Sequence, residues 1–316
     1  FMWLLKKFAA ILTTLIFVVI SLLYFFYYLH SVSVPNEYEN IETGHLRTQV
    51  NVFSHSAGIK EIVANNERDA YFAIGYSQAQ DRMFQMDIMR RTARGELSEI
   101  YGKKFLYFDK FMRTLKLKEI ASKNAKLTNK HVKVLLKNYC DGINFYLNKN
   151  KDRLHFAFSA LNYFPEKWSV EDCYLIERLF AYQMSVAFRY DVNFGNIAEL
   201  VGIDKTMKLL PNFEQYASFI YDDLQNDSTK LKKKKKIASN KYTKSIEYTK
   251  IMDNLNNFLR DSIYKSMILA KTFGCNALAM KKIQASKSSA ILANDFHSEL
   301  TIPSLWYQTI VSYPGT

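Results

Sequence analysis

The longest uncharged run of the chain lies near its N-terminus and restricts what this part of the sequence can become. From Phe8 to Leu29 every residue is apolar, aromatic, serine or threonine, and none carries a charge. A helix of this length is about long enough to cross a hydrocarbon layer of roughly 30 Å. We therefore predict a transmembrane helix or signal anchor over residues 8–29, preceded by a cytoplasmic stub at residues 1–7.

The residues that flank this run predict its orientation. Lys6 and Lys7 precede it, and basic residues favour the cytoplasmic side of a membrane. The run is also longer than the apolar core of a cleavable signal peptide, which has roughly 7–15 residues. We expect the anchor to be retained and a polar tether to follow at residues 30–45. The rest of the chain is then extracytoplasmic, in a periplasmic or extracellular location.

Composition excludes some classes of protein. The chain has 316 residues, of which 48% are hydrophobic, and this is typical of a globular protein with a substantial core. The net charge of +13 is partly concentrated in the lysine block at residues 230–236, and such blocks usually form solvated segments. The block contains no interleaved aromatic residues and follows a membrane span, so we predict no nucleic-acid binding. Attraction to anionic lipid headgroups stays possible as an alternative.

The three cysteines differ in their surroundings. Cys140 and Cys173 both lie in apolar helical patterns, where a cysteine usually acts as a small buried hydrophobe. Outside the cytoplasm an odd count leaves at least one thiol unpaired. Cys275 follows Gly274 and begins a strand-like run, which predicts a thiol at the very start of a buried strand. A self-cleaving precursor would place a nucleophile at such a position.

Two helices and a hairpin are well signalled. Residues 46–63 alternate around a glycine-containing turn and predict a β-hairpin. A helix is expected from Asn66, as N-cap, to about Gly95, with Gly75 marking close packing because glycine is unfavourable inside a helix. A further helix is expected over residues 171–188, capped by Ser169.

Several long motifs resemble the penicillin acylase family of N-terminal-nucleophile hydrolases. The first covers the predicted helix, the second a Tyr-x-x-Gly helix, the third a Pro-x-x-Trp turn, and the last two the C-terminal strands. In this sequence they read Ala79-Gln80-Asp81-Arg82-Met83-Phe84-Gln85-Met86-Asp87, Tyr139-Cys140-Asp141-Gly142-Ile143-Asn144, Pro165-Glu166-Lys167-Trp168-Ser169-Val170-Glu171-Asp172, Gly274-Cys275-Asn276 and Asn294-Asp295-Phe296-His297.

The resemblance implies a fold and a domain order. The fold class is α+β: an N-terminal-nucleophile αββα sandwich, here incomplete, with a largely helical α-chain portion preceded by one transmembrane helix. The chain would be truncated early in the β chain, and this fragment alone would be inactive. The implied divisions are an acylase α-chain region at residues 46–221, a lysine-rich spacer at residues 222–274 and the start of the β chain at residues 275–316.

The resemblance also implies an activity and its site. The family hydrolyses linear amides of N-acyl small molecules, such as penicillins or acyl-homoserine lactones, and its β chain typically begins with serine. Here Cys275 would be the nucleophile, freed by autocleavage of the Gly274–Cys275 bond, and the product would be an α/β heterodimer. His297 would assist catalysis by orienting the freed amine or the substrate, and Phe180 and Met184 would contact the acyl group. The alternatives are a core histidine at 297 and ordinary core residues at 180 and 184.

The amide hydrolysis that the resemblance implies requires no cofactor. It implies a possible structural calcium ion, with Asp191 as the nearest candidate ligand and Tyr190 as the alternative position. The chemistry of Cys275 can also be argued from the residues alone, because a freed α-amine, with a reference pKa of roughly 7.7–8.0, can accept the thiol proton. Two alternatives stay open: a catalytically inactive, membrane-anchored acylase-like binding protein, and a truncated fragment.

Overall fold

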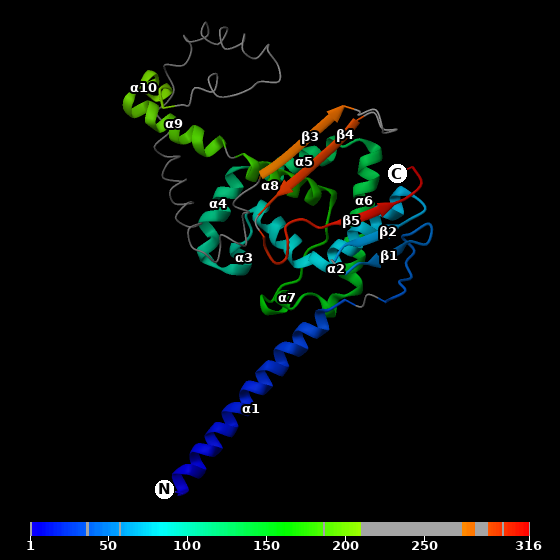
Figure 1. Cartoon of the computed structure of the whole chain (residues 1–316), viewed down its shortest axis with the longest axis vertical. Helices are drawn as coiled ribbons and strands as arrows, with labels where there is room; N and C mark the ends of the chain where they lie inside the picture. Colours follow the sequence, from blue (N-terminus) through cyan, green and yellow to red (C-terminus); the bar gives the residue numbers. More distant parts are fainter. Residues whose placement is uncertain are drawn as a thin grey trace. The chain divides into compact units, whose positions relative to one another are not determined.

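The computed structural model describes residues 2–35, 38–56, 58–185, 187–209, 274–281, 290–298 and 300–315. Its helices and strands follow one another along the chain as Figure 1 shows. The elements are α1 (Met2–Ser33), β1 (Asn51–Ser54), β2 (Lys60–Val63), α2 (Glu67–Arg94), α3 (Ser98–Tyr101), α4 (Leu106–Thr114), α5 (Leu117–Leu127), α6 (Lys130–Lys149), α7 (Phe156–Ala160), α8 (Val170–Met184), α9 (Ala187–Val201), α10 (Ile203–Met207), β3 (Gly274–Lys281), β4 (Ala290–His297) and β5 (Thr309–Ser312), with short 3-10 turns at Lys103–Phe105 and Lys151–Arg153.

The chain divides into two compact units. One contains residues 1–180 and 272–316, and the other contains residues 181–271. Within the second unit, α9 and α10 are joined at Gly202, whose positive φ of 86° suits a residue without a Cβ. The lysine block and nearly all of the predicted spacer lie outside the described residues. Gly274, predicted as the last spacer residue, is the first residue of β3.

Helix α1 contains the predicted membrane span. Residues Met2–Tyr28 form a stretch that is long and apolar enough to cross a membrane, with a mean hydropathy of 2.5, and none of it is buried. The helix is longer than predicted, because it includes Met2 to Lys7 and continues to Ser33 at the start of the expected tether. It ends just before Val34-Pro35, since a residue that precedes proline is disfavoured in the helical conformation.

The N-terminal hairpin forms as the alternation predicted. β1 and β2 are antiparallel, with Asn51 opposite Val63 and Ser54 opposite Lys60. Gly58 closes the turn in the left-handed region at φ 74°. β5 then pairs in parallel with β2, so the sheet order is β1-β2-β5. The sheet therefore joins residues of the expected α-chain region to residues of the expected β-chain region through backbone hydrogen bonds.

Helices α2 and α6 cross at two glycines. A Cβ added to Gly75 would lie 2.0 Å from the carbonyl oxygen of Tyr139, and one added to Gly142 would lie 2.1 Å from that of Phe72. No Cβ can approach a backbone oxygen so closely, so each helix presents bare backbone to the other. This confirms the close packing predicted at Gly75. Ala79, Met83 and Ile143 are buried in the core that the two helices share.

The ends of α2 are those predicted from sequence. The side chain of Asn66 accepts a hydrogen bond from the backbone N–H of Asp69 at 3.0 Å, as an N-cap does. Gly95 terminates the helix in the left-handed conformation at φ 66°. The buried carboxylate of Asp69 in turn accepts hydrogen bonds from the backbone N–H groups of Arg47 and Thr48. The start of α2 therefore fixes the chain that enters β1.

The hydrogen bonds to Asp69 predict that the folded protein loses stability in acid. Burial raises the pKa of the Asp69 carboxyl, but the hydrogen bonds from Asn66, Arg47 and Thr48 outweigh burial, so the folded pKa lies below the ordinary value. A lowered pKa contributes stability above the unfolded-state value of about 3.9, and that stability is lost as the pH falls through the folded pKa. We expect Asp69→Asn to destabilise the protein by about 1–3 kcal/mol at pH 7.

The difference between wild type and Asp69→Asn should shrink as the pH falls below about 4, because the wild-type carboxyl is then protonated as well. Thermal unfolding of the detergent-solubilised protein from pH 7 to pH 3 measures this. Asp152→Asn, which changes an exposed carboxylate, is the control and should have little effect at any pH. A constant difference across the pH range would contradict the role given to Asp69.

The predicted cap of α8 is confirmed, and its predicted end is wrong. The backbone N–H and hydroxyl of Ser169 both donate to Asp172 at 2.9 Å, and the Asp172 N–H returns to the Ser169 hydroxyl. The helix ends at Met184 instead of residue 188, and α9 begins at Ala187. No glycine or proline marks this break, so hydrophobic periodicity alone extended the helix too far.

Candidate functional site

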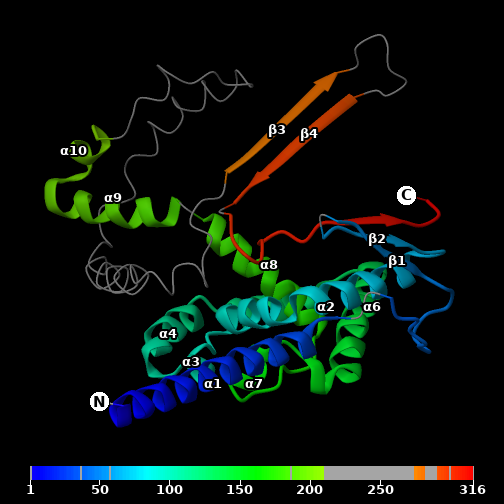
Figure 2. The same ribbon diagram turned by 60° about the horizontal axis from the view of Figure 1, so that its bottom comes forward.

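The predicted cleavage site lies at the open end of a two-stranded antiparallel hairpin. β3 and β4 pair so that Gly274 is opposite His297, Cys275 is opposite Phe296 and Asn276 is opposite Asp295. Figure 2 shows the two strands side by side. The Gly274–Cys275 peptide bond therefore runs alongside the backbone of Phe296 and His297. The Gly274-Cys275-Asn276 motif and the Asn294-Asp295-Phe296-His297 motif are therefore paired with each other across the two strands.

His297 and Asp295 lie two positions apart on β4 and form a polar pair. The Nε2 atom of His297 is 3.4 Å from Oδ2 of Asp295, and both side chains are more than half exposed. Adjacent strand residues point to opposite faces, so His297 and Asp295 share a face with Gly274 and Asn276. A carboxylate next to a histidine can orient the imidazole ring.

The strand that begins at Cys275 is not buried, which corrects the prediction. Residues 276–280 of β3 are exposed, and so are residues 291–295 of β4. Leu278, Leu292 and Met280 are 58%, 74% and 38% exposed. Each strand of this sheet has one neighbour in the part of the chain that is described, and neither face is covered there. The apolar pattern predicted the strand correctly, but burial depends on what packs against it.

The segment that follows β4 packs against α2. The Tyr307 hydroxyl donates to Asp81 at 2.7 Å, and the Gln85 side chain donates to the Ser304 carbonyl at 3.1 Å. Trp306 stacks on Phe180 of α8, with ring centroids 5.8 Å apart and an interplanar angle of 12°. Together with the β2–β5 ladder, these contacts attach residues 304–312 to the helices that precede the predicted cut.

Phe180 also lines a groove of about 360 Å³. The groove is mainly apolar and aromatic, and its polar residues come from α2. Its lining comprises Tyr71, Ile74, Gln78, Arg82, Gln85, Met86 and Met89 of α2, Leu136 and Tyr139 of α6, Cys173, Ile176 and Phe180 of α8, and Trp168, Leu305 and Tyr307. Met184, the other residue predicted to contact the acyl group, is 47% exposed.

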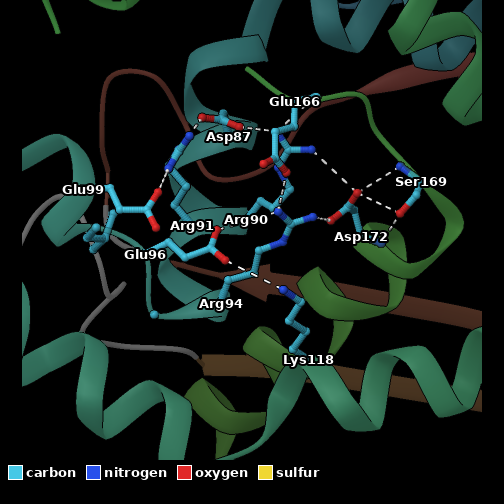
Figure 3. A network of polar contacts seen from close by, with 12 residues as sticks. Asp87, Arg90, Arg91, Arg94, Glu96, Glu99, Lys118, Glu166, Ser169 and Asp172 are labelled. Carbon is cyan, nitrogen blue, oxygen red and sulfur yellow. Dashed lines mark hydrogen bonds and ion pairs between the residues drawn. The ribbon is translucent and has the colours of Figure 1, made fainter. Parts of the chain in front are cut away.

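A network of charged side chains holds the Pro-x-x-Trp turn and the start of α8 against α2 (Figure 3). Arg90 is buried and donates to Asp87 and to the carbonyls of Glu166 and Lys167. Its guanidinium also lies 4.8 Å from the Trp168 ring centroid. Buried charges are tolerated only when they are paired in this way. Trp168, which is itself buried, therefore takes part in the contact between the turn and α2.

Arg94 makes the second connection between α2 and α8. Its guanidinium donates to Asp172 at 2.5 Å and to Glu166 at 2.8 Å. Burial lowers the pKa of Arg94, but the charge of Asp172 and the hydrogen bond to Glu166 outweigh it and raise the pKa above its ordinary value. In return, the hydrogen bond from Arg94 lowers the pKa of Glu166. The contacts of Arg94 therefore connect α2 to the start of α8, the helix that carries Phe180.

Replacing Asp87 tests how much this charged network contributes to the stability of the fold. The Asp87 carboxylate is fully buried and pairs with Arg90 and Arg91, and it accepts from the Tyr163 hydroxyl at 3.0 Å. Asp87→Asn removes the charge and leaves two arginines partly uncompensated. We expect a destabilisation of about 3–5 kcal/mol, measured by thermal unfolding in detergent.

Glu99→Gln is the matched control for Asp87→Asn. Glu99 pairs with Arg91 at 2.9 Å, but its side chain is 58% exposed, so solvent screens the pair. Such pairs contribute about 0–1 kcal/mol. If Asp87→Asn lost no more stability than Glu99→Gln, the buried network would not be what holds α8 in place.

The calcium site that the resemblance implies stays a prediction. Asp191 lies in α9 and its side chain is exposed. Among the residues that the structure describes, no group of three or more histidine, cysteine, aspartate or glutamate side chains could hold a metal ion. A hard cation such as calcium needs six to eight oxygen ligands. Asp191 alone does not supply them, and no step of the chemistry is assigned to a metal.

These observations define a mixed helical and sheet protein with an apolar N-terminal helix. The chain belongs to the penicillin amidase family, whose model matches residues 49–316. It is 27% identical to acyl-homoserine lactone acylase QuiP of Pseudomonas aeruginosa, over 85% of this chain and 30% of the relative. It is 34% identical to the enzyme of the same name from Pseudomonas putida, over 52% of this chain and 20% of the relative.

Penicillin acylases also match. Penicillin G acylase of Escherichia coli is 29% identical over 41% of this chain and 16% of its own length. Among solved structures, a thermostable penicillin G acylase from Alcaligenes faecalis matches with 21% identity and a TM-score of 0.42, over 55% of this chain and 94% of that chain. The chain spans about 30% of the length of the first QuiP relatives that it matches.

Sequence reasoning identified the motifs around the site but missed how they contact one another. Asp81 and Gln85 were recognised only as parts of a motif. Their contacts with Tyr307 and Ser304, and the stacking of Trp306 on Phe180, join segments that are distant in the sequence. The adjacency of Cys140 and Cys173 was also missed, because each lies in its own helical pattern. None of these contacts between distant residues leaves a local signal in a single sequence.

Proposed function

We propose that this chain belongs to a self-processing amidohydrolase that hydrolyses a linear amide of an N-acyl small molecule. The sequence assigns Cys275 as the nucleophile and the Gly274–Cys275 bond as the bond that is cut. Membership of the penicillin amidase family supports the reaction class. The relatives are named as acyl-homoserine lactone acylases and penicillin acylases, and this supports an N-acyl amide as substrate.

The first step is the cut itself. The thiol of Cys275 attacks the carbonyl carbon of Gly274, the peptide nitrogen leaves as the amine of Cys275, and a thioester forms. Water then hydrolyses the thioester, which releases the Gly274 carboxylate and regenerates the thiol. Gly274 carries no side chain that would hinder the approach or restrict the turn. The register that sets Gly274 opposite His297 is the observation that most strongly supports this assignment.

The second step uses the group that the cut creates. The freed α-amine of Cys275 has a reference pKa of roughly 7.7–8.0, so it is partly neutral near pH 7 and can accept the thiol proton. The thiolate attacks the substrate carbonyl, the amine product leaves, and water hydrolyses the acyl-enzyme. His297 lies one register position from Cys275 and next to Asp295, a position suited to orienting the new amine.

The two chains produced by the cut would remain together as a heterodimer. β2 and β5 form a parallel ladder across the proposed cut, and Tyr307 donates to Asp81 of α2. Burial and the nearby charge of Asp81 raise the pKa of Tyr307, so its hydroxyl remains a donor at neutral pH. These contacts require no continuous backbone between α2 and β5.

We assign the remaining parts of the chain in the same way. Residues 222–274 form the spacer, α1 anchors the enzyme in a membrane, and the acylase part lies outside the cytoplasm. Phe180, stacked on Trp306 and lining the apolar groove, supports an apolar acyl chain or aryl group as the recognised part of the substrate. Met184 follows one helical turn after Phe180, which keeps it as the second proposed acyl contact.

Mass spectrometry of the mature full-length product tests this proposal directly. We expect a β chain whose first residue is Cys275, together with an α chain that ends at or before Gly274. The purified enzyme is then offered amides with a fixed amine and increasing acyl length, including an acyl-homoserine lactone and a phenylacetylated β-lactam. A single intact polypeptide that hydrolyses none of them would refute the proposal and favour a membrane-anchored binding protein.

A further inference from the structure

Two cysteines from different helices lie next to each other beside the groove. Cys140 is in α6 and Cys173 is in α8, separated by 33 positions in the sequence, and their sulfur atoms are 3.7 Å apart. Both are free thiols in this structure, and one donates a weak hydrogen bond to the other. A disulfide bond has a sulfur–sulfur distance of about 2.05 Å. The two sulfur atoms are therefore in van der Waals contact but are not bonded.

The two thiols differ in their access to solvent. Cys140 is 4% exposed and belongs to the core that also contains Ile143 and Trp168. Cys173 is only partly buried, packs at the edge of that core and lines the groove. A reagent that enters the groove therefore meets the sulfur of Cys173 first. Cys140 lies directly behind it.

We propose that Cys140 and Cys173 form a disulfide bond that joins α6 to α8. This inference goes beyond the amidase activity, which does not require it. It uses the extracytoplasmic location that α1 and the two lysines before its apolar run predict, because disulfides persist in oxidising compartments and are rare in the cytosol. Cys275 remains outside the pair, so the disulfide leaves the proposed nucleophile as a free thiol.

The reaction balances as an exchange with an acceptor disulfide, such as that of a thiol–disulfide oxidoreductase. The thiolate of Cys173 attacks one acceptor sulfur and the other leaves as a thiolate, which gives a mixed disulfide. Cys140 then loses its proton, and its sulfur attacks that of Cys173 and expels the acceptor. The pair loses two electrons and two protons, and the acceptor is reduced to a dithiol.

The order of these steps follows from the geometry. The hydrogen bond that Cys140 shares with Cys173 and the burial of Cys140 both raise the pKa of Cys140, which makes Cys140 a poor first nucleophile. Once Cys173 carries the acceptor, Cys140 needs to react only with a sulfur already beside it. Cys173 therefore acts as the attacking thiol and Cys140 as the resolving thiol.

The disulfide would fix the helix that carries Phe180. It would close a loop that includes the end of α6, α7 and the Pro-x-x-Trp turn, and this removes conformational freedom from the unfolded chain. For a loop of this length we expect reduction to lower the midpoint of thermal unfolding by about 5–10 °C. Cys140→Ala and Cys173→Ala should each lower it similarly and make the midpoint insensitive to reductant.

The decisive experiment uses the full-length protein, taken from its native compartment and blocked with N-ethylmaleimide at lysis. Peptide mass spectrometry without reduction should find the peptides of Cys140 and Cys173 linked, and both should become alkylated only after reduction. The Cys275→Ala variant is the matched control, because it removes a different thiol and should keep the link. Cys140→Ala should leave Cys173 alkylated before reduction.

One result would overturn the inference. If Cys140 and Cys173 are both alkylated before reduction, and oxidised glutathione fails to link them in the purified protein, the two cysteines are packing residues only. This result is independent of the amidase proposal, because cleavage at Gly274–Cys275 and hydrolysis of the acyl panel are measured separately. An active, processed enzyme without the link would refute the disulfide alone.

Discussion

Replacing Cys275 with alanine is expected to leave the full-length product as one uncut polypeptide without amidase activity. The methyl side chain cannot attack the Gly274 carbonyl, so neither the thioester nor the new α-amine forms. Loss of the nucleophile that carries the covalent intermediate should lower the rate by at least about 10⁴-fold. The two measurements are the mass of the mature protein and the initial rate on the best acyl amide.

The Cys275→Ser variant tests the chemistry of the nucleophile, because it changes the attacking atom without removing it. Serine retains an attacking oxygen at the same position, and the family resembled by this sequence typically has serine there. We therefore expect slower but detectable cleavage and a working, weaker enzyme, because a hydroxyl is less acidic than a thiol. If the serine and alanine variants behaved alike and both remained uncut, with wild type also uncut, Cys275 would not be the nucleophile.

Gly142→Ala is expected to destabilise the helical part strongly. The new Cβ would lie 2.1 Å from the Phe72 carbonyl oxygen and 2.9 Å from the Tyr76 nitrogen, and both are backbone atoms that cannot turn aside. Helices α2 and α6 would have to separate, which would open the core along their crossing. We expect a loss of at least about 3 kcal/mol and poor recovery of folded protein.

Gly195→Ala is the matched control for this change. Gly195 lies inside α9, and a Cβ added there would meet nothing within 4 Å. Alanine is a better helix former than glycine by about 1 kcal/mol, so this variant should be neutral or slightly stabilised. Thermal unfolding of both variants in detergent measures the difference. Equal midpoints would show that α2 and α6 can relax apart without penalty.

Much of the local structure could be predicted because its causes are local. Asn66 and Gly95 mark the ends of α2 with side-chain and backbone geometry that a single stretch of sequence contains. The alternation in residues 46–63 gave the β1–β2 hairpin. The end of α8 was missed because nothing local breaks the apolar period near Met184. Burial of β3 was wrongly expected because burial is a property of neighbours.

For the site, the sequence predicts chemistry and the tertiary structure decides proximity. Gly274, Cys275 and His297 were singled out by residue type and motif, and their roles remain proposals. That Gly274 faces His297 follows only from the β3–β4 register. Trp306 reaches Phe180 because β5 pairs with β2 and brings the C-terminal segment back across α2 and α8.

The sequence by itself determined the long apolar N-terminal helix, the family, the caps of α2 and α8 and the identity of the candidate nucleophile. Each of these depends on residues that are neighbours along the chain, so a pattern or motif contains the whole signal. Only the tertiary structure decided that Cys140 lies against Cys173, that two glycines form the α2–α6 crossing, and that a buried arginine network holds α8. These contacts join distant segments, and packing selects them from many arrangements that the same local patterns would allow.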